Sequence, residues 1–162
     1  MEIEIRRADT HDIEGMSVVV DSAWRENYRH FFTEEKISAY TGDRRRKSFA
    51  KLLNDGRDIF VLLNNGVITA VSACAECEES PFEDYAEIIQ LYVLPECQRK
   101  GFGKELLSHT LEKLREKGFK GSVLSTAEKN ENARRFYEKF GFAEHSSKEY
   151  DGVVYITYMI DF

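Results

Sequence analysis

The most constraining feature of this chain is a change of pattern between residues 86 and 117. The apolar run "AEIIQLYVL" is followed by the turn "QRKGFG" and then by the amphipathic run "KELLSHTLEKLREKG". The first run lacks clean alternation, which predicts a strand buried on both faces. One face of the second run, read as a helix, carries Leu106, Leu107, Thr110, Leu111 and Leu114. A buried strand that passes directly into a helix is typical of an α/β architecture.

The turn between them has the character of an anion-binding site. The first turn of a helix leaves backbone N–H groups without partners, and the helix dipole adds partial positive charge there. Gly101 and Gly103 have no Cβ and so permit close approach of a ligand, while Arg99, Lys100 and Lys104 add cations. The pattern favours a di- or triphosphate-like anion. A tight turn that only packs the helix against the sheet is the alternative.

Two other phosphate-binding motifs do not fit this turn. The P-loop requires G-x-x-x-x-G-K-[ST], and the turn has neither that spacing nor the hydroxyl residue. The Rossmann fingerprint requires G-x-G-x-x-G near the first strand, whereas only G-x-G occurs here and it comes late in the chain.

Patterns elsewhere predict the remaining elements. Asn65-Gly66 and Asp151-Gly152 are signals for tight hairpin turns, and Thr33 is a plausible helix N-cap. The predicted order is β-α-α-β-β-β-α-β-α-β-β, with Gly42 able to split the second helix. This order describes a mixed sheet of about seven strands flanked by about four helices. Because no linker or repeat appears, residues 1–162 are predicted to form a single domain.

The composition of the chain argues against several classes of protein. The net charge of −6 argues against general DNA or RNA binding, which requires a basic footprint. No apolar run is long enough to cross a bilayer and no signal peptide pattern opens the chain, so we expect a cytoplasmic protein without a membrane partner. Cys74 and Cys77 lack a second ligand pair at metal spacing, so we expect structural cysteines and no metal site.

Three linked motifs between Ala86 and Phe142 resemble those of the GNAT N-acetyltransferase superfamily. The turn resembles the acyl-CoA loop of that family, Gln/Arg-x-x-Gly-x-Gly/Ala. The strand before it resembles the fourth strand of the family, with an acidic residue near its start and a "YV-x-P" end. The segment "NENARRFYEKFGF" resembles the family pattern N-x-x-A-x-x-x-Y-x-x-x-G-F, matched by Asn130, Ala133, Tyr137, Gly141 and Phe142. Residues before Ala86 match only in the order of their predicted elements.

The resemblance implies a splayed sheet that holds acetyl-CoA. The loop amides would bind the pyrophosphate, and the main chain of the fourth strand would pair with the pantetheine arm. Carried over residue by residue, the implied cofactor-binding residues are Leu91, Tyr92, Val93, Gln98, Arg99, Lys100, Gly101, Phe102, Gly103, Lys104, Asn130, Ala133 and Tyr137. Asn130 could also act as a helix N-cap, alone or together with a cofactor contact.

The resemblance also implies two catalytic residues. Tyr137 matches the general acid of the family, although a core tyrosine is the alternative. Proton transfer from a phenol of pKa about 10 to the conjugate base of a thiol of pKa about 8.5 is uphill, so we expect Tyr137 mainly to orient and hydrogen-bond the sulfur. Glu87 aligns with the position that supplies a base in several members, because an ammonium must lose a proton before it attacks. A rim glutamate is the alternative reading.

The leading hypothesis is therefore an acetyl-CoA-dependent N-acetyltransferase, in which a primary amine attacks the thioester directly. A small-molecule acceptor, polyamine-like or amino-acid-like, is preferred. The acidic stretch "AECEESPFEDYAE" would attract a cation, but a solvated loop is the simpler interpretation. The rival functions are an inactive CoA-binding module and a protein N-terminal or lysine acetyltransferase. By analogy, the C-terminal hairpin is a candidate homodimer interface.

Overall fold

A computed structural model describes residues 2–30, 32–79 and 81–162 of the chain. The described residues form seven strands: β1 (Ile3–Arg7), β2 (Asp58–Asn64), β3 (Val67–Glu76), β4 (Tyr85–Val93), β5 (Gly121–Ala127), β6 (Ala143–Tyr150) and β7 (Val153–Asp161). They form five α-helices: α1 (Ile13–Tyr28), α2 (Glu34–Ala39), α3 (Asp43–Asn54), α4 (Phe102–Glu116) and α5 (Glu131–Phe140). Two single 3₁₀ turns, η1 (Thr10–Asp12) and η2 (Pro95–Cys97), complete the set.

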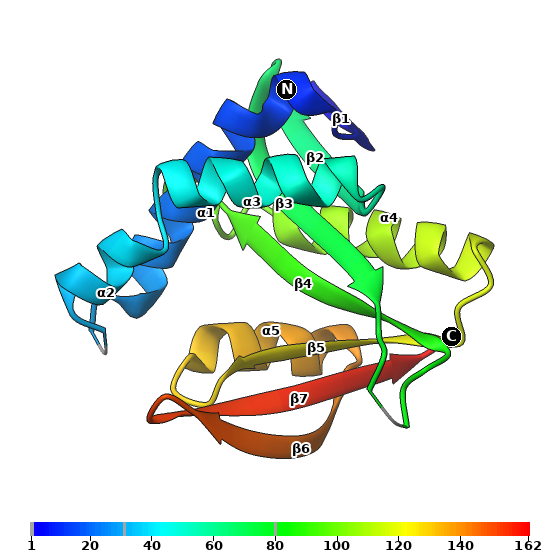
Figure 1. The fold of residues 1–162 in the computed structure, drawn as a ribbon. Coiled ribbons are helices and arrows are strands. Elements are labelled where there is room, and N and C mark those ends of the chain that lie inside the picture. The colour runs from blue at the N-terminus through cyan, green and yellow to red at the C-terminus, as the bar shows by residue number, and fades with distance from the viewer. Residues whose placement is uncertain (1, 31, 80) are drawn as a thin grey trace. The chain divides into compact units, whose positions relative to one another are not determined.

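The strands follow the order β1-β2-β3-β4-β5-β7-β6 (Figure 1). β4 and β5 run parallel, whereas β1 and β2, β5 and β7, and β6 and β7 pair antiparallel. This arrangement confirms the predicted mixed sheet. The chain divides into two compact units: the first contains the chain up to Ala73 together with Gln90–Thr110, and the second contains Cys74–Ile89 and Leu111–Phe162.

The first unit is built around β2, whose run "DIFVLLN" is apolar on both faces. Its alternate residues Ile59, Val61 and Leu63 pack in one cluster with apolar residues of α1 and α3, including the fully buried Phe49. Phe60, from the opposite face, packs in a second cluster with residues of α4. A strand covered on both sides needs no polar face, which explains the continuous apolar run.

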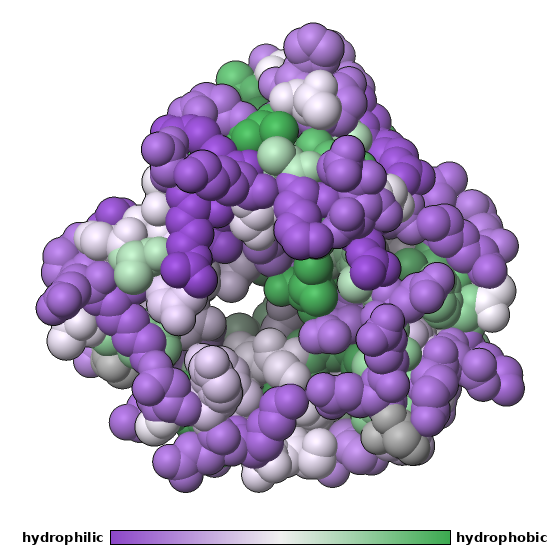
Figure 2. Space-filling model, viewed as in Figure 1, coloured by the Kyte–Doolittle hydropathy of each residue, from purple (hydrophilic) through white to green (hydrophobic). Residues whose placement is uncertain are grey.

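A partly buried polar contact links α3 to α1. One carboxylate oxygen of Asp21 accepts a hydrogen bond from the backbone N–H of Gly42 at 2.8 Å, and the other accepts from Arg45 Nε at 3.0 Å. Gly42, at φ +71°, separates α2 from α3, so the second predicted helix is two helices in the structure. The outward face of α3 is hydrophilic (Figure 2), as expected for the run "DRRRK".

Both predicted hairpin turns are confirmed. Asn65 and Gly66 have φ values of +51° and +84°, and Asp151 and Gly152 have φ values of +52° and +78°. Two consecutive residues with positive φ are the requirement of a type I′ turn, which matches the twist of the flanking strands. The Asn-Gly and Asp-Gly pairs therefore set where β2–β3 and β6–β7 reverse direction.

In the second unit, α5 covers one face of the β5-β7-β6 strands (Figure 1). Tyr158 of β7 is fully buried beneath this helix, where its hydroxyl accepts a hydrogen bond from Arg134 Nε at 3.0 Å and donates one to Glu138 at 3.3 Å. Gly121 begins β5 where only a glycine fits, because a Cβ there would lie 2.3 Å from the backbone oxygen of Ile160. The opposite face of these strands carries Phe82, which is buried against Cys77 and Val123.

A β-bulge interrupts the pairing of β6 with β7. Glu144 lies opposite Tyr158 and Ser146 lies opposite Thr157, so His145 is an extra residue. One extra residue exchanges the faces of every residue that follows it in the strand. Glu144 therefore lies on the face covered by α5, where it is 3.7 Å from Arg134, while Ser146 and Lys148 lie on the other face.

No helix among the described residues is long and apolar enough to span a membrane. Cys74 and Cys77 are buried thiols, as expected for structural cysteines, and Cys97 is half-buried. In the parts of the chain that the structure covers, no group of three His, Cys, Asp or Glu residues is placed to hold a metal ion.

Candidate active site

The loop between β4 and α4 has an unusual backbone. After η2, Arg99 adopts φ +64° and Gly101 adopts φ +85°, and the helix begins at Phe102. The first α-helical bond runs from the N–H of Glu105 to the carbonyl of Gly101 at 3.0 Å. The N–H groups of residues 102–104 therefore precede the helical bonding and are available to a ligand. This geometry is what the sequence motif predicted.

Two details suit this loop to a bulky anion. A Cβ built on Gly101 would meet nothing within 4 Å, so the space beside this residue is open. A left-handed arginine is uncommon because its Cβ crowds the backbone, and such strain concentrates at ligand-binding turns. Arg99, Lys100 and Lys104 are all exposed, so their charges border the open side of the loop.

The predicted cofactor strand belongs to the same unit as the loop. Leu91 and Val93 pack against the cluster that contains Phe102, and Tyr92 packs against the cluster on the other face. Because these side chains are used in packing, what they could offer a cofactor is their main chain. The parallel pairing of β4 with β5 covers Tyr85 to Glu87 against Gly121 to Val123, and residues 91–93 lie beyond it.

The opening of α5 is capped by Asn130. Its side-chain oxygen accepts a hydrogen bond from the backbone N–H of Ala133 at 3.2 Å, which satisfies one of the free donors of the first turn. The N-cap interpretation is thus confirmed, and the cofactor contacts of Asn130 and Ala133 stay predictions.

Replacing Asn130 with alanine is expected to lower the free energy of unfolding by about 1 kcal/mol, because the N-cap hydrogen bond is lost. Chemical denaturation measures this change. Asn130→Asp keeps an acceptor at the cap and should restore the stability. If its negative charge also weakens coenzyme A binding while stability is normal, Asn130 lies close to the cofactor phosphates; equal affinity would remove Asn130 from the cofactor site.

Tyr137 points inward from α5, as predicted. Its side chain is 8% exposed, and its ring makes edge contacts with Phe136 at 5.3 Å and Phe142 at 5.7 Å between centroids. These contacts fix the ring firmly, which is required both of a core tyrosine and of an oriented acid. The role of Tyr137 as an acid stays a prediction.

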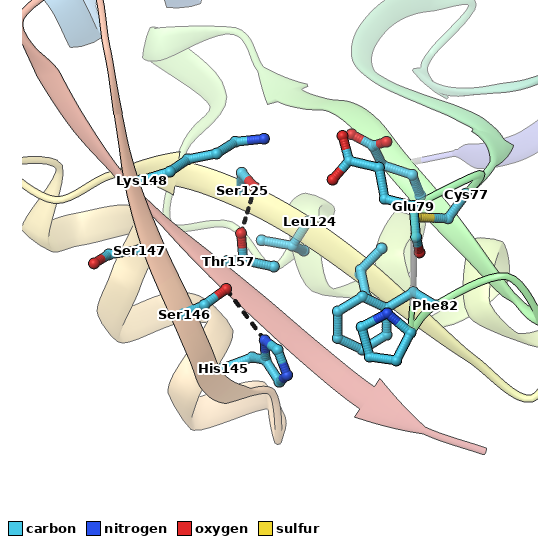
Figure 3. Close-up of a pocket in the computed structure, with 13 residues that line it drawn as sticks. Cys77, Glu79, Phe82, Leu124, Ser125, His145, Ser146, Ser147, Lys148 and Thr157 are labelled. Atoms are coloured by element: carbon cyan, nitrogen blue, oxygen red, sulfur yellow. Dashed lines mark hydrogen bonds between the residues drawn. The ribbon is translucent and has the colours of Figure 1, made fainter.

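Glu87 faces a pocket of about 190 Å³ in the second unit (Figure 3). The residue is half-buried in β4 opposite Val123, on the sheet face that α5 leaves uncovered. The polar groups of the pocket come from the β3–β4 connection and from the three neighbouring strands: Glu79, Ser125, His145, Ser146, Lys148 and Thr157. The candidate base therefore lies where a small molecule has room.

Burial raises the pKa of the Glu87 carboxyl, and the negative charge of Glu79 raises it further, whereas Lys148 lowers it. A raised pKa strengthens a carboxylate as a base, so it suits the removal of a proton from an ammonium group. The loop that carries Glu79 is held in place by the buried Phe82, whose N–H donates to the carbonyl of Glu79 at 2.8 Å. The acidic residues of this connection, Glu79 included, are exposed, as expected for a solvated loop, and Glu79 also lines the pocket.

The sequence analysis missed the polar side of this pocket. Ser125, His145, Ser146, Lys148 and Thr157 were not singled out, because the polar run of β6 and the single residues Ser125 and Thr157 carry no local signal for a site. The acidic connection was noticed, and Glu79 from it lines the pocket.

Aromatic and cationic side chains of the first unit have structural partners. Trp24 of α1 packs against Tyr28 with 4.5 Å between ring centroids. In the "RRRK" run, Arg45 binds Asp21 and Arg46 binds Glu14 at 2.7 Å. These contacts account for the two arginines without a phosphate ligand.

Comparison with known proteins agrees with these features. The model of the acetyltransferase (GNAT) family matches residues 9–142. A spermidine N(1)-acetyltransferase of Thermoplasma acidophilum is 29% identical over 145 residues, which is 88% of this chain and 89% of that protein. An uncharacterized N-acetyltransferase of Archaeoglobus fulgidus is 34% identical over 141 residues, 83% of this chain and 89% of the relative.

Solved structures show the same fold. The crystal structure of the PaiA N-acetyltransferase from Thermoplasma acidophilum, determined in complex with coenzyme A, superposes with a TM-score of 0.84 at 23% identity. The match covers 100% of both chains. The family match extends over most of the chain and includes all three motifs, which confirms the predicted acyltransferase class. The chain belongs to the GNAT acetyltransferase family.

Proposed function

We propose that this protein transfers the acetyl group of acetyl-CoA to a primary amine on a small molecule. The observation that carries the proposal is the position of Glu87, a half-buried carboxylate that faces a pocket next to the paired part of β4. A base in such a place is useful for amine chemistry, because a primary amine with a pKa near 10 is mostly protonated at neutral pH.

The loop from Gln98 to Lys104 would hold the pyrophosphate of coenzyme A. Free N–H groups at the start of α4 and the open space at Gly101 support this role. The main chain of Leu91, Tyr92 and Val93 would bind the pantetheine arm. The coenzyme A complex of the PaiA relative supports the choice of cofactor.

The reaction would proceed by direct attack in a ternary complex. Glu87 takes a proton from the ammonium, directly or through a water, and the amine nitrogen then forms a bond to the thioester carbon. A backbone N–H of β4 stabilises the negative oxygen of the tetrahedral intermediate. The carbonyl then re-forms, the C–S bond breaks and its electron pair leaves with sulfur. The nitrogen gives up its second proton, which neutralises the thiolate through the Tyr137 hydroxyl or through water. Positioning of the two substrates supplies much of the acceleration.

Two classes of acceptor fit the acidic pocket, polyamine-like and amino-acid-like amines. The similarity to a spermidine acetyltransferase supports the first, at 29% identity. A protein acceptor is the second candidate function, favoured by 34% identity over 100 residues with the bS18-alanine N-acetyltransferase of Haemophilus influenzae. That match covers 60% of this chain. A cytoplasmic location and a homodimer remain further expectations.

Release of free thiol from acetyl-CoA in the presence of polyamines, amino acids, aminoglycosides and short peptides tests the proposal. Thiol release that requires an amine, together with a product heavier by one acetyl group, would support it. Coenzyme A binding without release for any acceptor would favour a binding module instead. Release with peptides alone would assign the protein-directed activity.

The pH dependence of kcat/KM is expected to show the ionisation of the Glu87 carboxyl. The base works only when ionised, so kcat/KM rises as the pH increases through the pKa of Glu87. Because this pKa is raised, the rise, which is the acid limb of the pH profile, lies at higher pH than for an ordinary glutamate. Glu79→Gln removes the negative neighbour that raises this pKa, so the acid limb should move to lower pH. Glu83→Gln makes the same charge change at an exposed residue of the same connection and should leave the limb in place. An acid limb unmoved by Glu79→Gln would contradict the role of Glu87 as base.

A further inference from the structure

We propose that the acceptor carries an anionic group in addition to its amine, and that Lys148 selects it. This inference rests on the proposed function and narrows its substrate class to amines such as amino acids. Two observations support it: the bulge in β6, which directs Lys148 to the pocket of the second unit, and the positions of the charged residues that line this pocket.

The bulge at His145 decides which β6 residues reach the pocket. Ala143 lies opposite Met159, and a regular strand would place His145 and Ser147 on that same face. With one extra residue, Ser146 and Lys148 lie on this face, as their pairing with Thr157 and Tyr155 requires, and His145 at the bulge and Ser147 also line the pocket. Bulges that re-aim side chains are common next to active sites. Lys148 is therefore directed at the pocket by a specific irregularity of the strand.

The negatively charged residues of the pocket come from other elements than its lysine. Glu79 lies on the β3–β4 connection, and Lys148 reaches in from β6 on the other side (Figure 3). Glu87 of β4 also lines the pocket. Within the described part of the chain, none of the three forms an ion pair with another protein group. A ligand with an ammonium at one end and an anion at the other would satisfy both sides at once.

Hydroxyl groups connect the two sides. Ser125, Thr157 and Ser146 lie in register across β5, β7 and β6, on the face that lines the pocket. Ser125 Oγ and Thr157 Oγ1 are 3.1 Å apart and share a hydrogen bond. Hydroxyls can donate to a carboxylate as well as accept from an ammonium, so this row suits a polar chain that spans the pocket.

The same arrangement disfavours a diamine. Once one amine nitrogen is at Glu87, a second ammonium that reached toward β6 would approach the positive charge of Lys148. An anion at that position would meet an attractive charge and hydroxyl donors. Like-charge contacts of this kind are an established means of rejecting a wrong partner.

A matched set of probes tests the inference. Cadaverine and δ-aminovalerate have the same chain length and differ in the second group, ammonium or carboxylate, while n-pentylamine has no second group. The wild-type protein should acetylate δ-aminovalerate with a kcat/KM at least about tenfold above that of cadaverine. Lys148→Glu should reverse the preference, and Lys148→Met should bring the two rates close together.

Lys139→Glu makes the same charge change at an exposed residue of α5 and is the control for net charge. Turnover of n-pentylamine by every variant would show that the catalytic machinery is intact. If pentylamine is acetylated but Lys148→Glu leaves the ratio of the other two unchanged, or if wild-type protein prefers cadaverine, the inference is wrong and the proposed function stands. If wild-type protein releases no thiol with any amine, both are overturned.

Discussion

Replacing Gly101 with valine is expected to weaken coenzyme A binding by about 100-fold or more, as measured by calorimetry. Gly101 has φ +85°, a conformation that costs a β-branched residue roughly 1–3 kcal/mol. Beyond its chain neighbours, a Cβ at this position would have no atom within 4 Å, so the substitution creates little steric conflict with the protein. The side chain would instead occupy the open space through which, in the proposed binding mode, a phosphate would reach the N–H groups of residues 102–104. The substitution therefore changes both the loop backbone and its accessible surface.

Gly56 provides a matched control for this substitution. It has φ +74° after the end of α3, and a Cβ there also meets nothing within 4 Å. Gly56→Val should thus lower the stability of the protein by a similar amount while leaving coenzyme A affinity within a few-fold of the wild type. Normal affinity in Gly101→Val would mean that the loop amides do not contact the cofactor phosphates. Loss of affinity in both variants would indicate a general effect on folding.

Local signals predicted most of the fold because the interactions that create them are local. Asn65-Gly66 and Asp151-Gly152 set the two hairpin turns by their own backbone preferences, and Thr33 caps α2 through a hydrogen bond to the N–H of Lys36 at 3.1 Å. The strand-turn-helix motif predicted the geometry at Gly101 because a helix opening has the same free N–H groups in every protein.

The pocket could not be predicted in the same way, because its shape depends on register. Nothing in the string "AEHSSKEY" marks His145 as the extra residue. The bulge is visible only once Glu144 is paired with Tyr158 and Ser146 with Thr157. Likewise, Glu79 is an exposed charge, and its place beside the pocket depends on the packing of Phe82 against Val123 of β5. Both features depend on contacts between residues far apart in sequence, which a local pattern does not contain.

Replacing Tyr137 with phenylalanine is expected to lower kcat by about 10- to 100-fold, because the hydroxyl that stabilises the departing thiolate is removed. Coenzyme A affinity should stay within a few-fold of the wild type. The fold should be retained, since the ring contacts with Phe136 and Phe142 do not involve the hydroxyl. Single-turnover kinetics with saturating acetyl-CoA and amine would measure the chemical step directly. An unchanged rate would remove Tyr137 from the mechanism and leave it as a core residue.

Tyr158→Phe separates a chemical effect from a structural one. Tyr158 is also a buried tyrosine next to α5, but its hydroxyl bonds Arg134 and Glu138 within the protein. Its loss should lower the free energy of unfolding by about 1 kcal/mol and leave the chemical step nearly unchanged. The two variants thus predict different patterns: slower chemistry for Tyr137→Phe, and normal chemistry with lower stability for Tyr158→Phe. Since both delete one phenolic oxygen under the same helix, a shared pattern would show that the helix packing, and no particular hydroxyl, controls the rate.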